Sequence, residues 1–166
     1  PGDAGISDGG APGAGGDAGA GADAGTPPPG ETCETAIDLT EGGTVTGSTA
    51  GARDDYDPDS DDDQCPFLLA TSYDVVYALA PSEPRAYRVT VVPTGSPSPG
   101  EGFDPMLYAS TDCGAPAGCI AGARLNGAGE MEQIELNVPA GETAYVIVDG
   151  EVAGEGGDFE LSVVLE

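Results

Sequence analysis

From residue 33 onward the chain consists of short runs of β-forming residues separated by Gly, Pro, Asp and Asn. In "YRVTVV" and "QIELNV" apolar and polar residues alternate, which is typical of strands that bury one face. Pro or Gly interrupts every window long enough for a helix, so the sequence shows no helical periodicity. The pattern predicts strands at 36–40, 43–49, 72–80, 86–93, 105–110, 132–139, 143–149 and 159–165.

The predicted strands indicate an all-β fold. About eight short strands with frequent turns are typical of two packed antiparallel sheets, so we expect a β-sandwich of jelly-roll-like topology. The apolar positions of these strands predict a core made of Ile37, Leu39, Val75, Tyr77, Leu79, Val89, Val91, Leu107, Ile134, Leu136, Val146, Val148, Leu161 and Val163.

The first 30 residues follow a different pattern. They are almost all Gly, Ala, Asp and Pro, and Ile6 is their one large apolar side chain. Such a stretch buries too little apolar surface to offset its chain entropy. The triplet "DAG" recurs there with irregular spacing, which excludes a collagen-like repeat. We therefore divide the chain into a low-complexity arm or linker, 1–30, and a β-sandwich domain, 31–166.

The charge of the chain limits the classes of molecule that it can bind. The net charge is −26, with four arginines and no lysine, histidine or tryptophan. Phosphate groups are bound by clustered cations, and these arginines are scattered, so nucleic acid and anionic membranes are excluded as partners. No apolar run reaches the roughly 18 to 20 residues of a membrane span. A hard divalent cation would relieve the repulsion among carboxylates, and we expect Ca²⁺ as the cofactor.

The densest group of carboxylates is the stretch "DDYDPDSDDDQC" at 54–65. Its D-x-D-x-D spacing is typical of loops in which successive carboxylates turn toward one calcium ion. An EF-hand is excluded in the frames that begin at Asp55, Asp57 or Asp59, because none ends on the required glutamate. A looser calcium site and a solvated acidic loop both remain open. The candidate ligands in this stretch are Asp55, Asp57, Asp59, Asp61 and Asp63.

The four cysteines, Cys33, Cys65, Cys113 and Cys119, indicate disulfides. The shortest spacing, in "CGAPAGC", is longer than a zinc knuckle, and no histidine is present to complete a zinc site. Disulfides imply an oxidising, extracytoplasmic location. Three pairings are open. We favour Cys113 with Cys119 as a local clasp and Cys33 with Cys65 as a longer staple.

The segments "YDVVYAL", "YRVTVV", "FDPMLYAS", "AYVIVDG" and "GDFELSVVL" together resemble the pre-peptidase C-terminal (PPC) β-sandwich modules of secreted bacterial proteins. The resemblance covers residues 33–166. It implies a non-catalytic, jelly-roll-like domain that is often calcium-stabilised and accompanies secreted enzymes or surface proteins. It also implies that Asp74, Asp104 and Asp149 are recurrent positions and candidate metal ligands. From the residues alone, a second interpretation is that these three aspartates accept hydrogen bonds from main-chain amides at turns.

The residue types also argue against an enzyme. Without histidine there is no Ser-His or Cys-His pair, without lysine there is no Schiff base, and "GxSxG" and "SxxK" are absent. We predict a calcium-stabilised structural protein, secreted or on the cell surface, such as a filament subunit that self-associates through its N-terminal arm. The alternative is a monomeric, tethered binding module for glycan or protein ligands.

Overall fold

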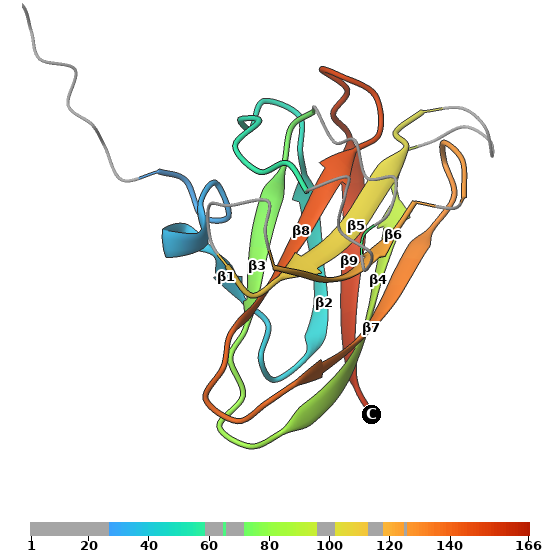
Figure 1. The fold of residues 1–166 in the computed structure, drawn as a ribbon. Helices are drawn as coiled ribbons and strands as arrows, with labels where there is room; N and C mark the ends of the chain where they lie inside the picture. The colour runs from blue at the N-terminus through green and yellow to red at the C-terminus, as the bar shows by residue number, and fades with distance from the viewer. Residues whose placement is uncertain (1–26, 59–64, 66–71, 96–101, 113–117, 125) are drawn as a thin grey trace, which may run out of the picture.

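The computed structural model describes residues 27–58, 65, 72–95, 102–112, 118–124 and 126–166 (Figure 1). Residues 1–26 of the arm lie outside this range, so self-association through the arm stays a prediction. Within the described residues, no helix is long and apolar enough to cross a membrane. Their elements, in chain order, are η1 (Cys33–Thr35), β1 (Ile37–Asp38), β2 (Gly43–Ser48), β3 (Val75–Leu79), β4 (Arg85–Pro93), β5 (Pro105–Ser110), β6 (Cys119–Ala123), β7 (Glu132–Val138), β8 (Ala144–Gly150) and β9 (Asp158–Leu165).

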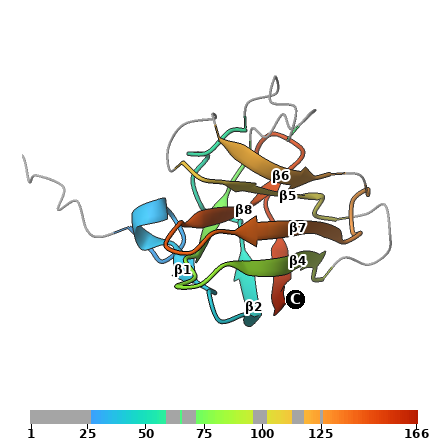
Figure 2. The same ribbon diagram turned by 60° about the horizontal axis from the view of Figure 1, so that its bottom comes forward.

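The strands form two stacked sheets (Figures 1 and 2). One sheet has the order β1-β3-β8-β5-β6, and the other has the order β2-β9-β4-β7. Apart from the short β1, this is the strand order of a jelly roll, in which β2-β9-β4-β7 faces β3-β8-β5-β6. The predicted fold class is confirmed. One pairing differs from the antiparallel expectation, because β1 runs parallel to β3.

Strand β6 was not predicted from the sequence. Its residues, "CIAGA", are mostly small and have low β-propensity, and its first residue, Cys119, is the one expected in a local disulfide clasp. The strand pairs antiparallel with β5, from Leu107 opposite Ala123 to Ser110 opposite Cys119. Tertiary pairing therefore overrides a weak local preference here.

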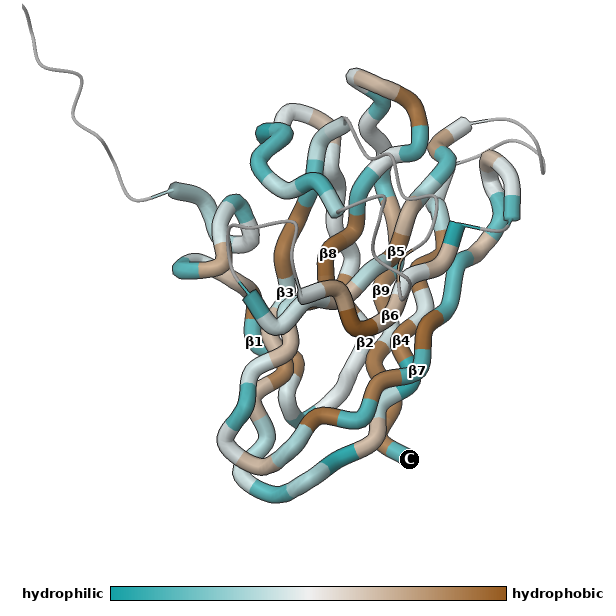
Figure 3. The backbone as a smooth tube through the Cα atoms, viewed as in Figure 1, coloured by the Kyte–Doolittle hydropathy of each residue, from teal (hydrophilic) through white to brown (hydrophobic). Residues whose placement is uncertain are grey.

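The core between the sheets consists of the residues that the alternation predicts. All of the predicted core residues except Ile37 are buried there, and Ile37 is half-buried at its border. Within this core, the rings of Tyr77 and Phe159 pack edge to face with centroids 6.4 Å apart. Alternating burial along β7 matches the alternating colours of that strand in Figure 3.

A second apolar layer covers the outer face of the five-stranded sheet. It contains Val76, Met106, Tyr108 and Ile147 together with three cysteines, Cys33, Cys65 and Cys119. Strands β3, β5 and β8 are therefore buried on both faces over most of their length. We did not predict this layer, although the unbroken apolar runs "VVYAL" and "PMLYAS" are typical of strands covered on both sides.

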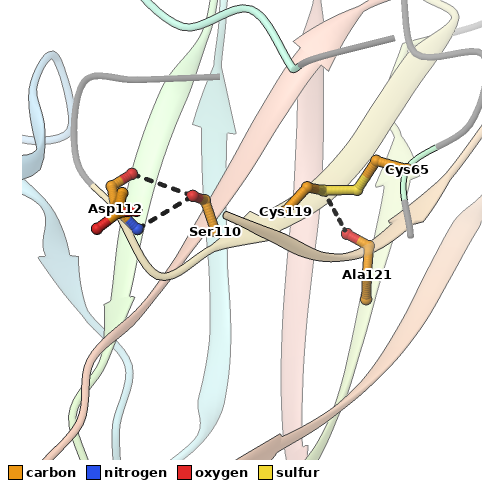
Figure 4. Close-up of a disulfide and its surroundings, with 5 residues drawn as sticks. All are labelled: Cys65, Ser110, Asp112, Cys119 and Ala121. Atoms are coloured by element: carbon orange, nitrogen blue, oxygen red, sulfur yellow. Dashed lines mark hydrogen bonds between the residues drawn. A yellow bond between two sulfur atoms is a disulfide. The ribbon is translucent and has the colours of Figure 1, made fainter. Parts of the chain in front are cut away.

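The favoured cysteine pairing is wrong. Cys65 is bonded to Cys119, with their Cα atoms 6.1 Å apart (Figure 4). Cys119 begins β6 and belongs to the outer apolar layer, where Cys65 also lies. Cys33 is disulfide-bonded as well, and Cys113 lies outside the described residues. The Cys65–Cys119 bond indicates an extracytoplasmic location.

Gly47 of β2 lies against the aromatic pair of Tyr77 and Phe159, and we expect its replacement by alanine to destabilise the domain. A Cβ atom there would lie 2.6 Å from Cζ of Phe159 and 2.7 Å from the Tyr77 hydroxyl oxygen. Overpacking of this kind typically costs about 1 to 3 kcal/mol. Gly127→Ala is the matched control, because a Cβ at Gly127 would meet no atom within 4 Å. Urea unfolding of both variants measures the difference, and equal stabilities would contradict the packing described here.

Candidate functional site

Two buried aspartates, Asp74 and Asp149, lie side by side at one end of the five-stranded sheet. Val75 of β3 pairs with Val148 of β8, so the same register places Asp74 opposite Asp149. Because side chains alternate along a strand, both carboxyl groups project from the outer face, the face that also carries Val76 and Ile147. Asp74 is 1% exposed and Asp149 is 0% exposed.

Each of these carboxyl groups has one satisfied oxygen and one unsatisfied oxygen. Oδ2 of Asp74 accepts hydrogen bonds from the main-chain N–H groups of Asp55 (2.9 Å) and Tyr56 (3.0 Å). Oδ1 of Asp149 accepts from the N–H group of Gly150 (2.6 Å). Oδ1 of Asp74 and Oδ2 of Asp149 are buried without a hydrogen-bond partner among the described residues. Buried polar atoms are nearly always paired, so two unpaired oxygens at facing positions of neighbouring strands indicate a ligand-binding role.

The electrostatics of the pair also favour a cation. Burial raises the pKa of Asp74 to about 7 and that of Asp149 to about 8. The carboxylates of Asp54 and Asp57, and that of Asp74 itself, raise the pKa of Asp149 further. Burial, followed by the charges of Asp149 and Asp74, holds the pKa of Tyr108 well above its ordinary value. A proton or a metal ion would offset this buried negative potential.

The donor set of the pair fits a hard cation such as Ca²⁺. Both unsatisfied atoms are carboxylate oxygens, the ligand type that Ca²⁺ prefers. In the described part of the chain, no three acidic or cysteine side chains are grouped so that they alone could hold a metal ion. Calcium takes about 6 to 8 oxygen ligands, so main-chain carbonyl groups and water would supply the remainder.

The other predicted ligands lie in different places. Asp55 contributes its main-chain amide to Asp74, and Asp57 is close enough to raise the pKa of Asp149. Asp104 has a different set of carboxyl neighbours. Burial, followed by Glu151, Glu155 and Glu132, raises its pKa to about 6. The remaining predicted ligands, Asp59, Asp61 and Asp63, lie outside the described residues.

A pocket of about 200 Å³ lies on the same outer face, farther along the sheet. Tyr108 of β5 and Ile147 of β8 belong to its lining, and the segment 55–58 forms another wall. Asp112 also lines it and is held near β5 by two hydrogen bonds with the Ser110 hydroxyl group (Figure 4). We did not predict this pocket, because its walls come from segments far apart in the sequence and no local pattern marks them.

Comparisons with known proteins concern the fold. No protein-family model matches the chain, and the search of curated proteins found no significant match. Among solved structures, the pre-peptidase C-terminal domain of a collagenase from Bacillus anthracis is similar at 17% identity and a TM-score of 0.49, covering 77% of this chain and 91% of that one. A periplasmic inhibitor of g-type lysozyme from Aeromonas hydrophila is similar at 15% identity and a TM-score of 0.43, covering 79% and 96%. The PPC resemblance predicted from the sequence is thus found again among solved structures.

Proposed function

We propose that this chain is a non-catalytic, extracytoplasmic β-sandwich module stabilised by a calcium ion bound between Asp74 and Asp149. The observation that carries the proposal is that two residues opposite each other on neighbouring strands each have a buried carboxylate oxygen without a hydrogen-bond partner among the described residues. The disulfide supports the location, because such bonds persist in oxidising compartments.

The ion would fasten the start of the acidic stretch onto the sheet. The N–H group of Asp74 donates to the Arg53 carbonyl oxygen (3.0 Å), and the Asp74 carboxylate accepts from Asp55 and Tyr56. The Tyr108 hydroxyl group donates to the Tyr56 carbonyl oxygen at 2.7 Å. Without a cation, repulsion between Asp74 and Asp149 opposes these contacts. With one, the same carboxylates hold segment 53–56 in place.

The overall charge of the chain also favours stabilisation by a bound calcium ion. All four arginines are in ion pairs with glutamates, so no arginine remains to neutralise the aspartate pair. The net charge of −26 destabilises the compact state through self-repulsion, and bound divalent cations reduce it.

We further propose that the module is secreted or displayed on the cell surface. The sequence resemblance to PPC modules supports this location. A tethered module that binds a ligand needs no assembly contact, whereas a filament subunit would depend on the arm. The described residues contain a pocket, so we favour the binding module over the filament.

Calcium is expected to raise the melting temperature of the purified chain. A ligand at about 100 times its dissociation constant adds about 2.7 kcal/mol, which is roughly 10 °C for a domain of this size. Differential scanning calorimetry in calcium and in chelator measures the shift. Asp149→Asn should abolish it, and Asp158→Asn, an exposed carboxylate on the other sheet, should preserve it. Identical melting temperatures in calcium and in chelator would contradict the proposed calcium site.

A further inference from the structure

The pocket beside the aspartate pair has a firm floor and a wall held in place by hydrogen bonds. Its floor comes from Tyr108 and Ser110 of β5, Ile147 of β8 and Cys119 of β6. The Cys65–Cys119 disulfide ties this floor to a distant part of the chain. The facing wall is fixed by the Tyr108 hydroxyl group, which donates to the Tyr56 carbonyl oxygen, and by the Cys33 N–H group, which donates to the Tyr56 hydroxyl group at 2.9 Å.

The size of the pocket restricts its ligand. A volume of about 200 Å³ is smaller than the clefts of about 300 to 1,000 Å³ that enclose drug-sized molecules. It suits one long side chain better than an oligosaccharide. Tyr56, Tyr108 and Ile147 offer apolar and aromatic surface for an aliphatic stem, and tyrosine rings attract a cationic head.

The charge of the pocket selects a cation. Asp55, Asp57 and Asp112 line it, and no arginine does. Anionic ligands would be repelled here, and a basic protein surface would be attracted to the acidic domain from a distance.

We infer that this pocket receives an arginine or lysine side chain from a basic protein partner, with the aliphatic stem against Tyr108 and Ile147 and the charged head among Asp55, Asp57 and Asp112. The inference goes beyond the proposed calcium site, because neither Asp74 nor Asp149 lines the pocket.

The test is a nuclear magnetic resonance titration of the full ¹⁵N-labelled chain in excess calcium. The probes are a capped Gly-Gly-Arg-Gly-Gly peptide and the same peptide with citrulline, which keeps the shape of arginine but lacks its charge. We expect saturable shifts for the amides of 55–57, 110–112 and 147 with the arginine peptide and none with the citrulline peptide. Asp57→Asn combined with Asp112→Asn should weaken binding about tenfold, and the matched control Asp158→Asn should leave it unchanged.

Several outcomes would overturn the inference without touching the calcium site. Equal shifts with citrulline would show that charge is not recognised, and shifts spread evenly over the acidic surface would show that the pocket is not the site. Equivalent shifts from a neutral oligosaccharide would assign the pocket to glycans. In a repeat of the titration that begins without calcium, displacement of the arginine peptide by added calcium would assign the pocket to the metal.

Discussion

Replacing Asp149 by asparagine is expected to make the calcium-free protein more stable near neutral pH than the unaltered chain. The folded-state pKa of Asp149 is about 8, far above its ordinary value, because its carboxylate is buried beside another. Near pH 8 the Asp149 carboxyl group is fully ionised in the unfolded chain. In the folded chain this group must either keep its proton or carry a buried charge, and both cost free energy. Asparagine removes that penalty, and we expect a gain of roughly 3 kcal/mol after allowing for its own unpaired amide.

The raised pKa values also determine whether the stability of the calcium-free protein rises or falls with pH. The pKa values of Asp74, about 7, and Asp149, about 8, are raised on folding, so the folded state binds more protons than the unfolded state over this range. The stabilisation is complete below the unfolded-state pKa of about 4 and is lost as the pH rises through about 7 to 8. Calcium should reverse the trend, since it binds the ionised carboxylates.

Urea unfolding in chelator at about pH 5 and about pH 8 measures both effects. Asp158→Asn serves as the control, because it removes an exposed carboxylate from the other sheet and should leave the pH dependence intact. Stability that rises across this pH interval in the calcium-free protein would contradict the burial of the pair.

Removing the Cys65–Cys119 bond by replacing both cysteines with serine is expected to destabilise the domain by about 4 kcal/mol. The bond links positions 54 residues apart, and closing so long a loop restricts the unfolded chain strongly. Its sulfur atoms also belong to the outer apolar layer, so two buried hydroxyl groups would replace apolar contacts. Urea unfolding measures the loss.

Peptide mapping of the unreduced protein checks the pairing on which this prediction depends. A linked pair of peptides containing Cys65 and Cys119 is expected. A peptide closed between Cys113 and Cys119 would contradict the pairing and restore the local clasp. The double serine variant also alters the floor of the pocket, because Cys119 is one of its lining residues.

The aspartate pair could be predicted only in part from the local sequence. Asp74 and Asp149 were predicted through a family resemblance, and in the structure they lie opposite each other and deeply buried. Asp104, predicted on the same grounds, has other acidic neighbours, Glu151 and Glu155. With 30 acidic residues in the chain, nothing local distinguishes a buried aspartate from a solvated one. The register between β3 and β8 makes that distinction.

The sequence by itself determined the strands other than β6 and the core between the sheets, because side chains alternate across a strand with a period of two and the pattern can be read within a few residues. The tertiary structure alone decided the cysteine pairing, strand β6 and the pocket. Each of these joins segments that are distant in the sequence, such as Cys65 with Cys119 or Tyr56 with Tyr108. Long-range pairing depends on how whole sheets pack, and this packing leaves no periodic trace in the local sequence.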